Sequence, residues 1–164
     1  RADEFLRREI ARAVRTGHPL CVALADIDHF KQINDGHSHG IGDRVLERVA
    51  QIFADRMRES DLVARYGGEE FLFCFIGASE PDAARVCEEL RLAVEREDWG
   101  RVATGLRVTM SVGIVACEGE PEVQSLMDRV DKRLYEAKRL GRNRVVPRPE
   151  RRTAHDEEMP LAGL

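Results

Sequence analysis

Hydrophobic positions along the chain follow two different periods. Four stretches repeat apolar residues at helical spacing and predict amphipathic helices. Ser79 and Pro81 supply capping chemistry at the start of the third helix, and Gly141 stands where the fourth would end. The apolar stripes of these helices lie at 5–14, 45–53, 86–94 and 123–137.

Strand-like patterns fill the intervals between the helices. The nearly continuous apolar run "LCVALADID" is typical of a buried central strand that ends near Asp26. The runs "LVARY" and "FLFCFI" flank Gly67-Gly68 and predict a hairpin with a two-residue type I′ turn, because both positions of that turn need positive φ. Residues 106–115 alternate and predict a half-buried strand, and residues 144–146 predict a short last strand. The interleaving predicts an α/β fold, in which helices flank a mixed sheet.

Polar and proline-rich segments mark the boundaries. Residues 29–43 are polar and rich in glycine, and predict a loop with room for a short helix. We expect one domain over 1–146 and a disordered tail or linker over 147–164, which has three prolines, mixed charge and no period. Because the first residue is Arg1 rather than methionine, we expect the domain to be truncated at its N-terminal edge and excised from a longer protein.

Charge and composition narrow the function classes. The net charge is −4 and no basic stripe is present, so we expect no nucleic-acid partner. No apolar run approaches the ~20 residues of a membrane-spanning helix, and no signal-peptide pattern opens the chain. The four cysteines lie in apolar patterns without a C-x-x-C pair, so we expect free, buried thiols in a reducing cytosol.

Two acidic clusters are candidates for a shared metal site. Asp26 and Asp28 end the central strand and can share a face, while Glu69 and Glu70 follow the predicted turn. Carboxylates completed by phosphate oxygens suit Mg²⁺ and two-metal phosphoryl or nucleotidyl transfer. The alternative is that acidic residues at strand ends and hairpins are simply solvated.

Candidate ligand-binding residues flank these clusters. Lys138 and Arg142 lie four apart, and either neutralise phosphates or complement the dipole of a helix C-terminus. Asn34 and Asp43 bracket the polar segment. Together they can read a guanine edge, but Asn34 can equally form a turn and Asp43 can cap the second helix.

Taken in order, the segments "ALADIDHFKQIND", "GD", "ARYGGEEF", "VTMSVGIV" and "DKRLYEAKRLGRNRV" closely resemble the GGDEF family, the diguanylate cyclases, in its GGEEF form. The resemblance runs from about Phe5 to Val146. It implies synthesis of cyclic di-GMP from two GTP molecules with release of two pyrophosphates. It also implies a mixed, mainly antiparallel sheet similar to the polymerase palm and to class III adenylyl cyclases.

The resemblance assigns a role to each candidate. Asp26, Glu69 and the Ile27 carbonyl are expected to ligate Mg²⁺, or Mn²⁺ in its place. Each active half-site is expected to hold two such ions. Glu70 is expected to bind the second metal or to lie near the attacking hydroxyl, and the turn would set Glu69 opposite Asp26. The remaining candidates are expected to bind the nucleotide. Asn34 and Asp43 would bind the guanine, and the phosphates would be bound by Lys138, Arg142, the N–H groups of His29 and Phe30, and Lys31.

The resemblance also implies partners. One domain holds one GTP, so activity requires a second GGDEF domain in a homodimer. An upstream sensor or receiver domain is expected to precede this chain, because most of the family's linking segment is absent from it. We expect a bacterial cytoplasmic location, with membrane tethering of the whole protein left open.

The motif "RESD" places Arg58 and Asp61 at the family's product-inhibition site, although R-x-x-D alone also suits a charged helix end. At two positions the sequence differs from the usual pattern of the family, one in the inhibitory site and one in the backbone after Asn34. Glu89 stands where a supporting arginine is expected, with Arg85 and Arg91 close by. Ser38 replaces a usual glycine, and would be strained if that position needs positive φ.

Two rival functions remain at this point. One is a binding module that senses cyclic di-GMP through Arg58 and Asp61 without useful catalysis. The other is a cyclase with a different product, such as a mixed purine dinucleotide, against which Asp43 as a guanine reader argues.

Overall fold

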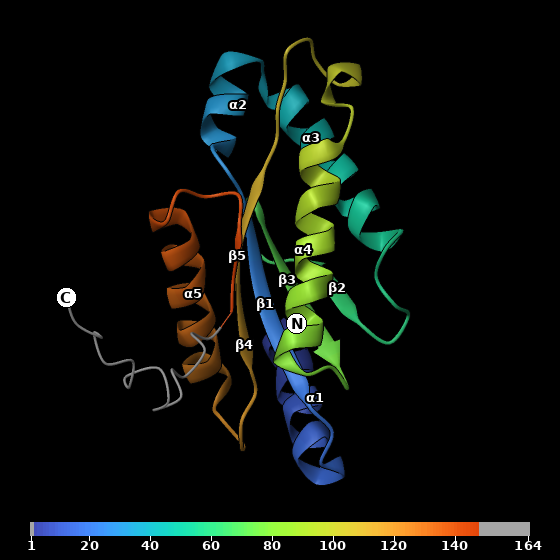
Figure 1. The fold of residues 1–164 in the computed structure, drawn as a ribbon, viewed down its shortest axis with the longest axis vertical. Coiled ribbons are helices and arrows are strands. Elements are labelled where there is room, and N and C mark those ends of the chain that lie inside the picture. Colours follow the sequence, from blue (N-terminus) through green and yellow to red (C-terminus); the bar gives the residue numbers. More distant parts are fainter. Residues whose placement is uncertain (1, 148–164) are drawn as a thin grey trace, which may run out of the picture.

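The computed structural model describes residues 2–147 (Figure 1). Apart from Pro147, the predicted tail at 147–164 lies outside the described residues. The elements in chain order are α1 (Ala2–Thr16), β1 (Leu20–Ile27), α2 (Phe30–Gly36), α3 (His39–Ala54), β2 (Leu62–Arg65), β3 (Glu70–Ile76), α4 (Glu80–Arg96), a 3₁₀ turn η1 (Trp99–Arg101), β4 (Met110–Ala116), α5 (Val123–Arg139) and β5 (Val145–Val146).

The strands form one sheet with the order β2-β3-β1-β4-β5. All neighbouring pairs are antiparallel except β4 and β5, which run parallel. The strand β1 lies at the centre and is buried along its whole length. The predicted fold class, a mixed and mainly antiparallel sheet flanked by helices, is confirmed.

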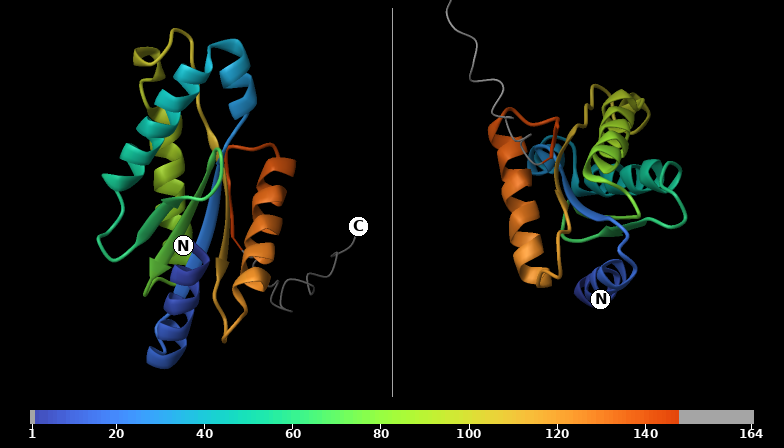
Figure 2. Two further views of the ribbon diagram at one scale, coloured as in Figure 1. Left: turned by 180° about the vertical axis from the view of Figure 1, so that it is seen from behind. Right: turned by 60° about the horizontal axis from the view of Figure 1, so that its bottom comes forward.

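Helices cover both faces of this sheet. The helices α3 and α4 lie on one face, and α1 and α5 lie on the other (Figure 2). Alternate β1 side chains enter two separate cores, because successive strand residues point to opposite faces. Ala23 joins the α3–α4 core, whereas Val22 and Leu24 pack with Leu6 of α1 and Val130 of α5.

The strand β4 differs from its prediction. It begins at Met110 rather than at residue 106, and six of its seven residues are buried on both faces instead of alternating. The cause is α5, which lies directly on this strand at Gly113. A Cβ at Gly113 would stand 2.7 Å from the Val130 carbonyl oxygen and from the Arg133 carbonyl carbon, so only glycine permits this approach.

The β2–β3 hairpin also differs from its prediction. Arg65 pairs with Phe71, and the Tyr66 N–H donates to the Glu70 carbonyl at 2.8 Å, so three residues, 67–69, form the loop. Neither Gly67 nor Gly68 has positive φ, so the predicted two-residue type I′ turn is wrong. The Arg65 guanidinium donates to the Gly68 carbonyl at 2.7 and 3.0 Å, and this contact stabilises the wider loop.

Two predictions from composition can be compared with the structure. The four cysteines are free; Cys117 is half-buried and the other three are buried. Burial raises the pKa of both Cys21 and Cys74 to about 12. Among residues 2–147 no helix combines the length and apolar character needed to span a bilayer.

Candidate active site

Two carboxylates meet where β1 ends and β3 begins. Asp26 stands directly opposite Glu70 in the antiparallel register, and the Ile27 N–H donates to the Glu69 carbonyl at 3.2 Å. Directly paired residues project to the same face of a sheet, so the Asp26 and Glu70 side chains share one face. The expectation that Glu69 lies opposite Asp26 is therefore wrong, because Glu69 precedes β3 and lies beside Ile27.

Lys138 supplies the positive charge nearest to this pair. It lies in the last turn of α5, and its Nζ is 3.1 Å from Asp26 Oδ2. Burial raises the pKa of the Asp26 carboxyl, and the Lys138 ammonium offsets part of this effect. Because Asp26 is only 8% exposed, Lys138 serves as its counter-cation in a largely dry environment.

Glu70 adds a second negative charge beside Asp26, and the Lys138 charge offsets only part of the resulting effect on the pKa of Glu70. Burial raises the pKa of Glu70, and the charges of Asp26 and Asp131 raise it further. Burial is the main cause of both shifts and neighbouring carboxylates add to it, so a cation beside Asp26 and Glu70 would stabilise their ionised forms. The end of β1 is therefore an electrostatically favourable place for a cation.

A metal ion at this place would need ligands besides the protein side chains. Within residues 2–147, no three His, Cys, Asp or Glu side chains are arranged to hold a metal ion by themselves. Mg²⁺ is commonly held by only one or two carboxylates, with water and substrate phosphates completing its shell. The hard oxygen donors of Asp26, Glu69 and Glu70 fit that kind of site.

Asp28, the second aspartate of "DID", has a different environment. Its carboxylate accepts hydrogen bonds from Thr109 Oγ1 and Ser111 Oγ, each at 2.7 Å, and from the Asn143 N–H at 3.0 Å. Asp28 is 5% exposed. These hydrogen bonds connect β1 to β4 and to the segment after α5, so Asp28 has a bridging role in the structure, whereas Asp26 is the aspartate paired with Glu70.

The polar segment after β1 is mostly helical rather than a loop. His29 has φ 55°, and this left-handed turn starts α2 immediately after the acidic site. Phe30 and Lys31 open α2, where the first N–H groups of a helix have no partner within the helix. These N–H groups and the exposed Lys31 therefore follow Asp26 within five residues of the chain.

The boundary between α2 and α3 corrects two expectations. Ser38 has φ 174°, which is extended backbone, so serine carries no strain there. Its Oγ accepts from the Ile41 N–H at 3.2 Å and caps α3. Asp43 therefore does not cap the second helix, as one alternative had it, because Asp43 lies inside α3.

Asn34 and Asp43 come together through these two helices. Asn34 lies in α2 rather than in a turn, and its amide packs on Gly42 of α3, where a Cβ would stand 2.9 Å from Asn34 Cγ and closer still to Oδ1. Asp43 follows Gly42 and lines a pocket of about 340 Å³ between α3 and the β2–β3 hairpin, together with Val63 and Phe71.

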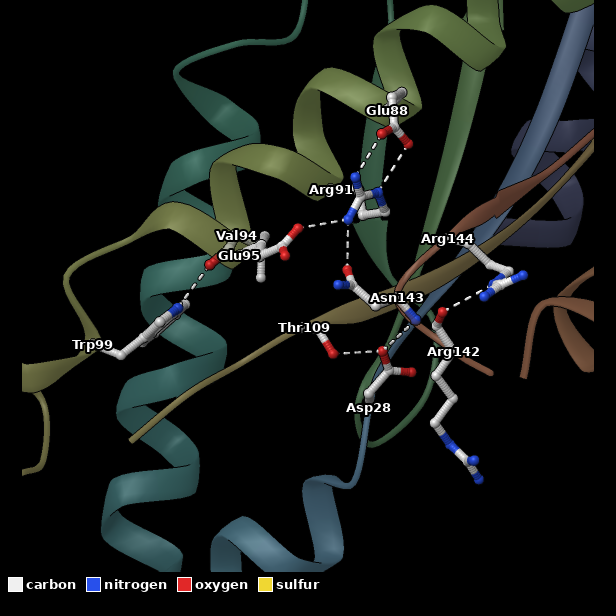
Figure 3. A network of polar contacts seen from close by, with 10 residues as sticks. All are labelled: Asp28, Glu88, Arg91, Val94, Glu95, Trp99, Thr109, Arg142, Asn143 and Arg144. Carbon is white, nitrogen blue, oxygen red and sulfur yellow. Dashed lines mark hydrogen bonds and ion pairs between the residues drawn. The ribbon is translucent and has the colours of Figure 1, made fainter. Parts of the chain in front are cut away.

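Arg142 lies beyond the end of α5, which stops at Arg139. It has φ 63°, and the next residue, Asn143, has φ 46°. Figure 3 shows the Arg142 side chain directed away from the surrounding polar network. Lys138 and Arg142 therefore do not share a helix face, although both lie at the C-terminal end of α5.

The "RESD" segment forms a turn rather than a helix end. The Asp61 N–H donates to the Arg58 carbonyl at 3.0 Å, and Asp61 Oδ1 accepts from the Ile76 N–H at 3.3 Å. Burial raises the pKa of the Asp61 carboxyl, and the Arg58 charge opposes that shift. The Arg58 side chain is exposed, so it is accessible to an anion.

The helix α4 carries Glu89, Arg85 and Arg91, the three residues at or near the position where an arginine supporting the inhibitory site is expected. Glu89 is ion-paired with Arg85 at 2.7 Å on the exposed side of the helix. Arg91 is 9% exposed and bonds Glu88, Glu95 and Asn143. Arg91 is therefore not available to support a ligand at Arg58, and the pattern of the sequence did not indicate its contact with Asn143.

Comparisons with known proteins identify similar sequences. A family profile described as "Diguanylate cyclase, GGDEF domain" matches residues 1–144. Diguanylate cyclase DosC of Escherichia coli is 44% identical over 143 residues, which are 86% of this chain and 31% of DosC. The chain thus spans about a third of that relative's length.

Solved structures show the same fold. The GGDEF domain of DgcB from Caulobacter crescentus, in complex with c-di-GMP, superposes with a TM-score of 0.83 at 35% identity, covering 88% of this chain and 86% of that one. A structure described as the active GGEEF domain of a diguanylate cyclase from Vibrio cholerae gives a TM-score of 0.81 at 30% identity, covering 86% and 90%.

Proposed function

Since the chain belongs to the GGDEF family of diguanylate cyclase domains, we propose that it condenses two GTP molecules into cyclic di-GMP and releases two pyrophosphates. The observation that carries the proposal is the meeting of Asp26, Glu70 and Lys138 at the end of β1. The two carboxylates there can bind a metal ion, and the ammonium can bind a phosphate at the same edge of the sheet.

Mg²⁺, or Mn²⁺ in its place, would be held by Asp26, Glu69 and the Ile27 carbonyl, with Glu70 beside a second ion. When bound, such ions stabilise charge on the α-phosphate and help to form the attacking 3′-alkoxide. Glu70 lies on the same face as Asp26, and its raised pKa suits a group near a proton that must be removed.

The chain's own residues orient the nucleotide. Lys138, which pairs with Asp26 here, would be free to bind a phosphate if Asp26 held a metal ion, and the exposed Arg142 and the N–H groups at the start of α2 offer further phosphate contacts. Asp43 lines the pocket at the hairpin, Asn34 packs on the neighbouring Gly42, and the two side chains together read the guanine edge. Positioning of this kind is the main protein contribution to phosphoryl transfer.

One domain holds one GTP, so two domains must face each other. The partner is therefore a second copy of this domain. A sensor or receiver domain attached to each copy would bring the two domains together. Because GTP is a cytosolic nucleotide, the proposal places the domain in the bacterial cytoplasm.

The test is a product assay with GTP and Mg²⁺, with and without a dimeric coiled coil fused before Ala2. We expect the fused dimer to form cyclic di-GMP much faster than the free chain at equal concentration. Chromatography after incubation with mixed ATP and GTP should give the diguanylate alone. Absence of any cyclic dinucleotide from a folded, dimeric fusion would refute the proposal.

Gly42→Ala is expected to weaken GTP binding about tenfold, because the new Cβ takes the space of the Asn34 amide. The domain should remain folded, because the atoms that the Cβ would meet belong to the side chains of Asn34 and Phe30 rather than to backbone, and alanine is a better helix former than glycine. Isothermal titration with a non-cleavable α,β-methylene GTP analogue measures the effect. Gly40→Ala is the matched control on the same helix, because its Cβ meets only Ser38 Oγ, at 3.7 Å. Equal affinities for both variants would remove Asn34 from the guanine site.

We further propose that Arg58 and Asp61 bind the product cyclic di-GMP and inhibit turnover. Arg58→Ala is expected to weaken product binding at least about tenfold, because a charge-assisted contact to phosphate is lost. Calorimetry with cyclic di-GMP measures this effect, and Arg101→Ala, an exposed arginine paired with Asp98, is the control. Unchanged affinity in Arg58→Ala would place the inhibitory contact elsewhere.

A further inference from the structure

A buried arginine on α4 is tied to the turn that carries Arg142. The Arg91 guanidinium donates to both oxygens of Glu88 at 2.5 and 2.8 Å, to Glu95 at 2.7 Å and to Asn143 Oδ1 at 2.6 Å (Figure 3). Two of these partners belong to its own helix. Asn143 is the long-range partner, 52 residues further along the chain.

Asn143 connects Arg91 to the acidic end of β1 through a second hydrogen bond. Its side-chain oxygen accepts from Arg91, while its backbone N–H donates to Asp28 Oδ2 at 3.0 Å. Asp28 is in turn fixed by the Thr109 and Ser111 hydroxyls. A continuous polar connection therefore runs from α4 through Asn143 to a residue two positions after Asp26.

The turn at 141–144 needs such a connection. Arg142 and Asn143 both have positive φ, which asparagine tolerates but which is unfavourable for arginine and persists where contacts hold it. The Arg142 N–H donates to the Ala137 carbonyl, and Arg144 Nε donates to the Arg142 carbonyl at 3.0 Å. These bonds secure the backbone of Arg142, while the Arg91–Asn143 bond secures the residue that follows it.

We propose that Arg91 and Asn143 are positioning residues: their hydrogen bond, continued to Asp28, holds the 141–144 turn so that the Arg142 guanidinium faces the nucleotide. The role of Arg142 as a phosphate ligand rests on the proposed function. The coupling of Arg91 to the turn does not, since it stands on the contacts of the structure alone.

The test uses the 164-residue chain fused to the dimeric coiled coil, with four single variants and the double variant Arg142→Ala/Asn143→Gly. Asn143→Gly removes the acceptor of Arg91 while keeping a residue that tolerates positive φ. Arg91→Met removes the donor, Arg142→Ala removes the phosphate contact, and Arg101→Ala is the control for loss of an exposed arginine. The probe is the α,β-methylene GTP analogue with Mg²⁺, measured by calorimetry.

We expect Asn143→Gly and Arg91→Met each to weaken analogue binding about tenfold. In an Arg142→Ala background, Asn143→Gly should cause no further loss, because it acts through Arg142. Independent, multiplicative losses would overturn the positioning role, and so would unchanged affinity in Asn143→Gly. If Arg91 and Asn143 only stabilised the fold, their variants would lower the melting temperature, and the losses of analogue binding in Asn143→Gly and Arg142→Ala would multiply.

Amide hydrogen exchange on the nucleotide-free protein separates this inference from the proposed function. In Asn143→Gly and Arg91→Met, the amides of residues 142 and 143 should exchange at least about tenfold faster, while those of β1 and β3 stay protected. Unchanged exchange at 142 and 143 would overturn the inference. If the unaltered protein bound no analogue, the proposed function would fall, and the exchange rates would still decide whether Arg91 holds the turn.

Discussion

Glu70→Gln is expected to reduce cyclic di-GMP formation by about a thousandfold or more while leaving the domain folded. Glu70 faces Asp26 across the β1–β3 register, so its carboxylate lies on the face where both the metal and the attacking hydroxyl are expected. Glutamine keeps the shape of the side chain but removes its charge and its capacity to accept a proton. The initial rate of product formation by the coiled-coil dimer, measured by chromatography, reports the loss.

The same variant should be more stable than the unaltered protein at neutral pH without metal or nucleotide. Burial, Asp26 and Asp131 raise the pKa of Glu70, so the folded domain holds the Glu70 proton more tightly than the unfolded chain does. The stabilisation from that proton is present below the usual glutamate pKa and is lost as the pH rises through the raised folded value. Above that value the ionised carboxylate destabilises the fold, and glutamine removes the effect.

Chemical denaturation between about pH 4 and pH 8 tests this pH dependence. The stability difference between Glu70→Gln and the unaltered protein should grow as the pH rises through that range. Glu4→Gln, at an exposed position of α1, is the matched control for replacing a glutamate by glutamine. Full cyclase activity in Glu70→Gln would remove Glu70 from the mechanism, and a pH-independent stability difference would contradict its crowded electrostatic environment.

Gly113→Ala is expected to lower the free energy of unfolding by about 3 kcal/mol, the upper range for overpacking a core. The new Cβ would press on the α5 backbone at Val130 and Arg133, which cannot move aside as a flexible side chain would. The helix α5 must therefore shift away from β4. Since α5 carries Lys138, the shift should also lengthen its contact with Asp26 and lower activity in the fraction that remains folded.

Urea denaturation compared with Gly36→Ala tests this prediction. A Cβ at Gly36 would meet no atom within 4 Å, so that variant should unfold within about 1 kcal/mol of the unaltered protein. If Gly113→Ala were as stable as Gly36→Ala, the close approach of α5 to β4 would not be a requirement of this fold.

Local patterns predicted the elements well where one period ran without interruption. The stripes of α1, α4 and α5 and the buried run of β1 were correct, because a helix or strand is encoded within a short window of residues. The polar segment at 29–43 was predicted mainly as a loop, yet it forms α2 and the first turns of α3. Ser38 and Gly42 explain the error, since a cap and a helix-packing glycine also resemble loop residues.

Local patterns could not predict contacts between segments that are distant in the sequence. The alternation of residues 106–115 predicted a half-buried strand, but α5 covers the second face of β4 at Gly113. The two glycines of "RYGGEEF" suggested a type I′ turn, but Arg65 closes a wider loop through its hydrogen bonds to Gly68. Each outcome depends on a partner that the local window does not specify.

The sequence by itself determined the order of helices and strands, the fold class and, through its motifs, the family to which the chain belongs. Only the tertiary structure decided that Glu70 rather than Glu69 faces Asp26, that Asp28 is a connector, and that Arg91 reaches Asn143. The physical reason is that periodicity reflects which residues face a core. Strand register and long-range hydrogen bonds depend instead on how whole elements pack.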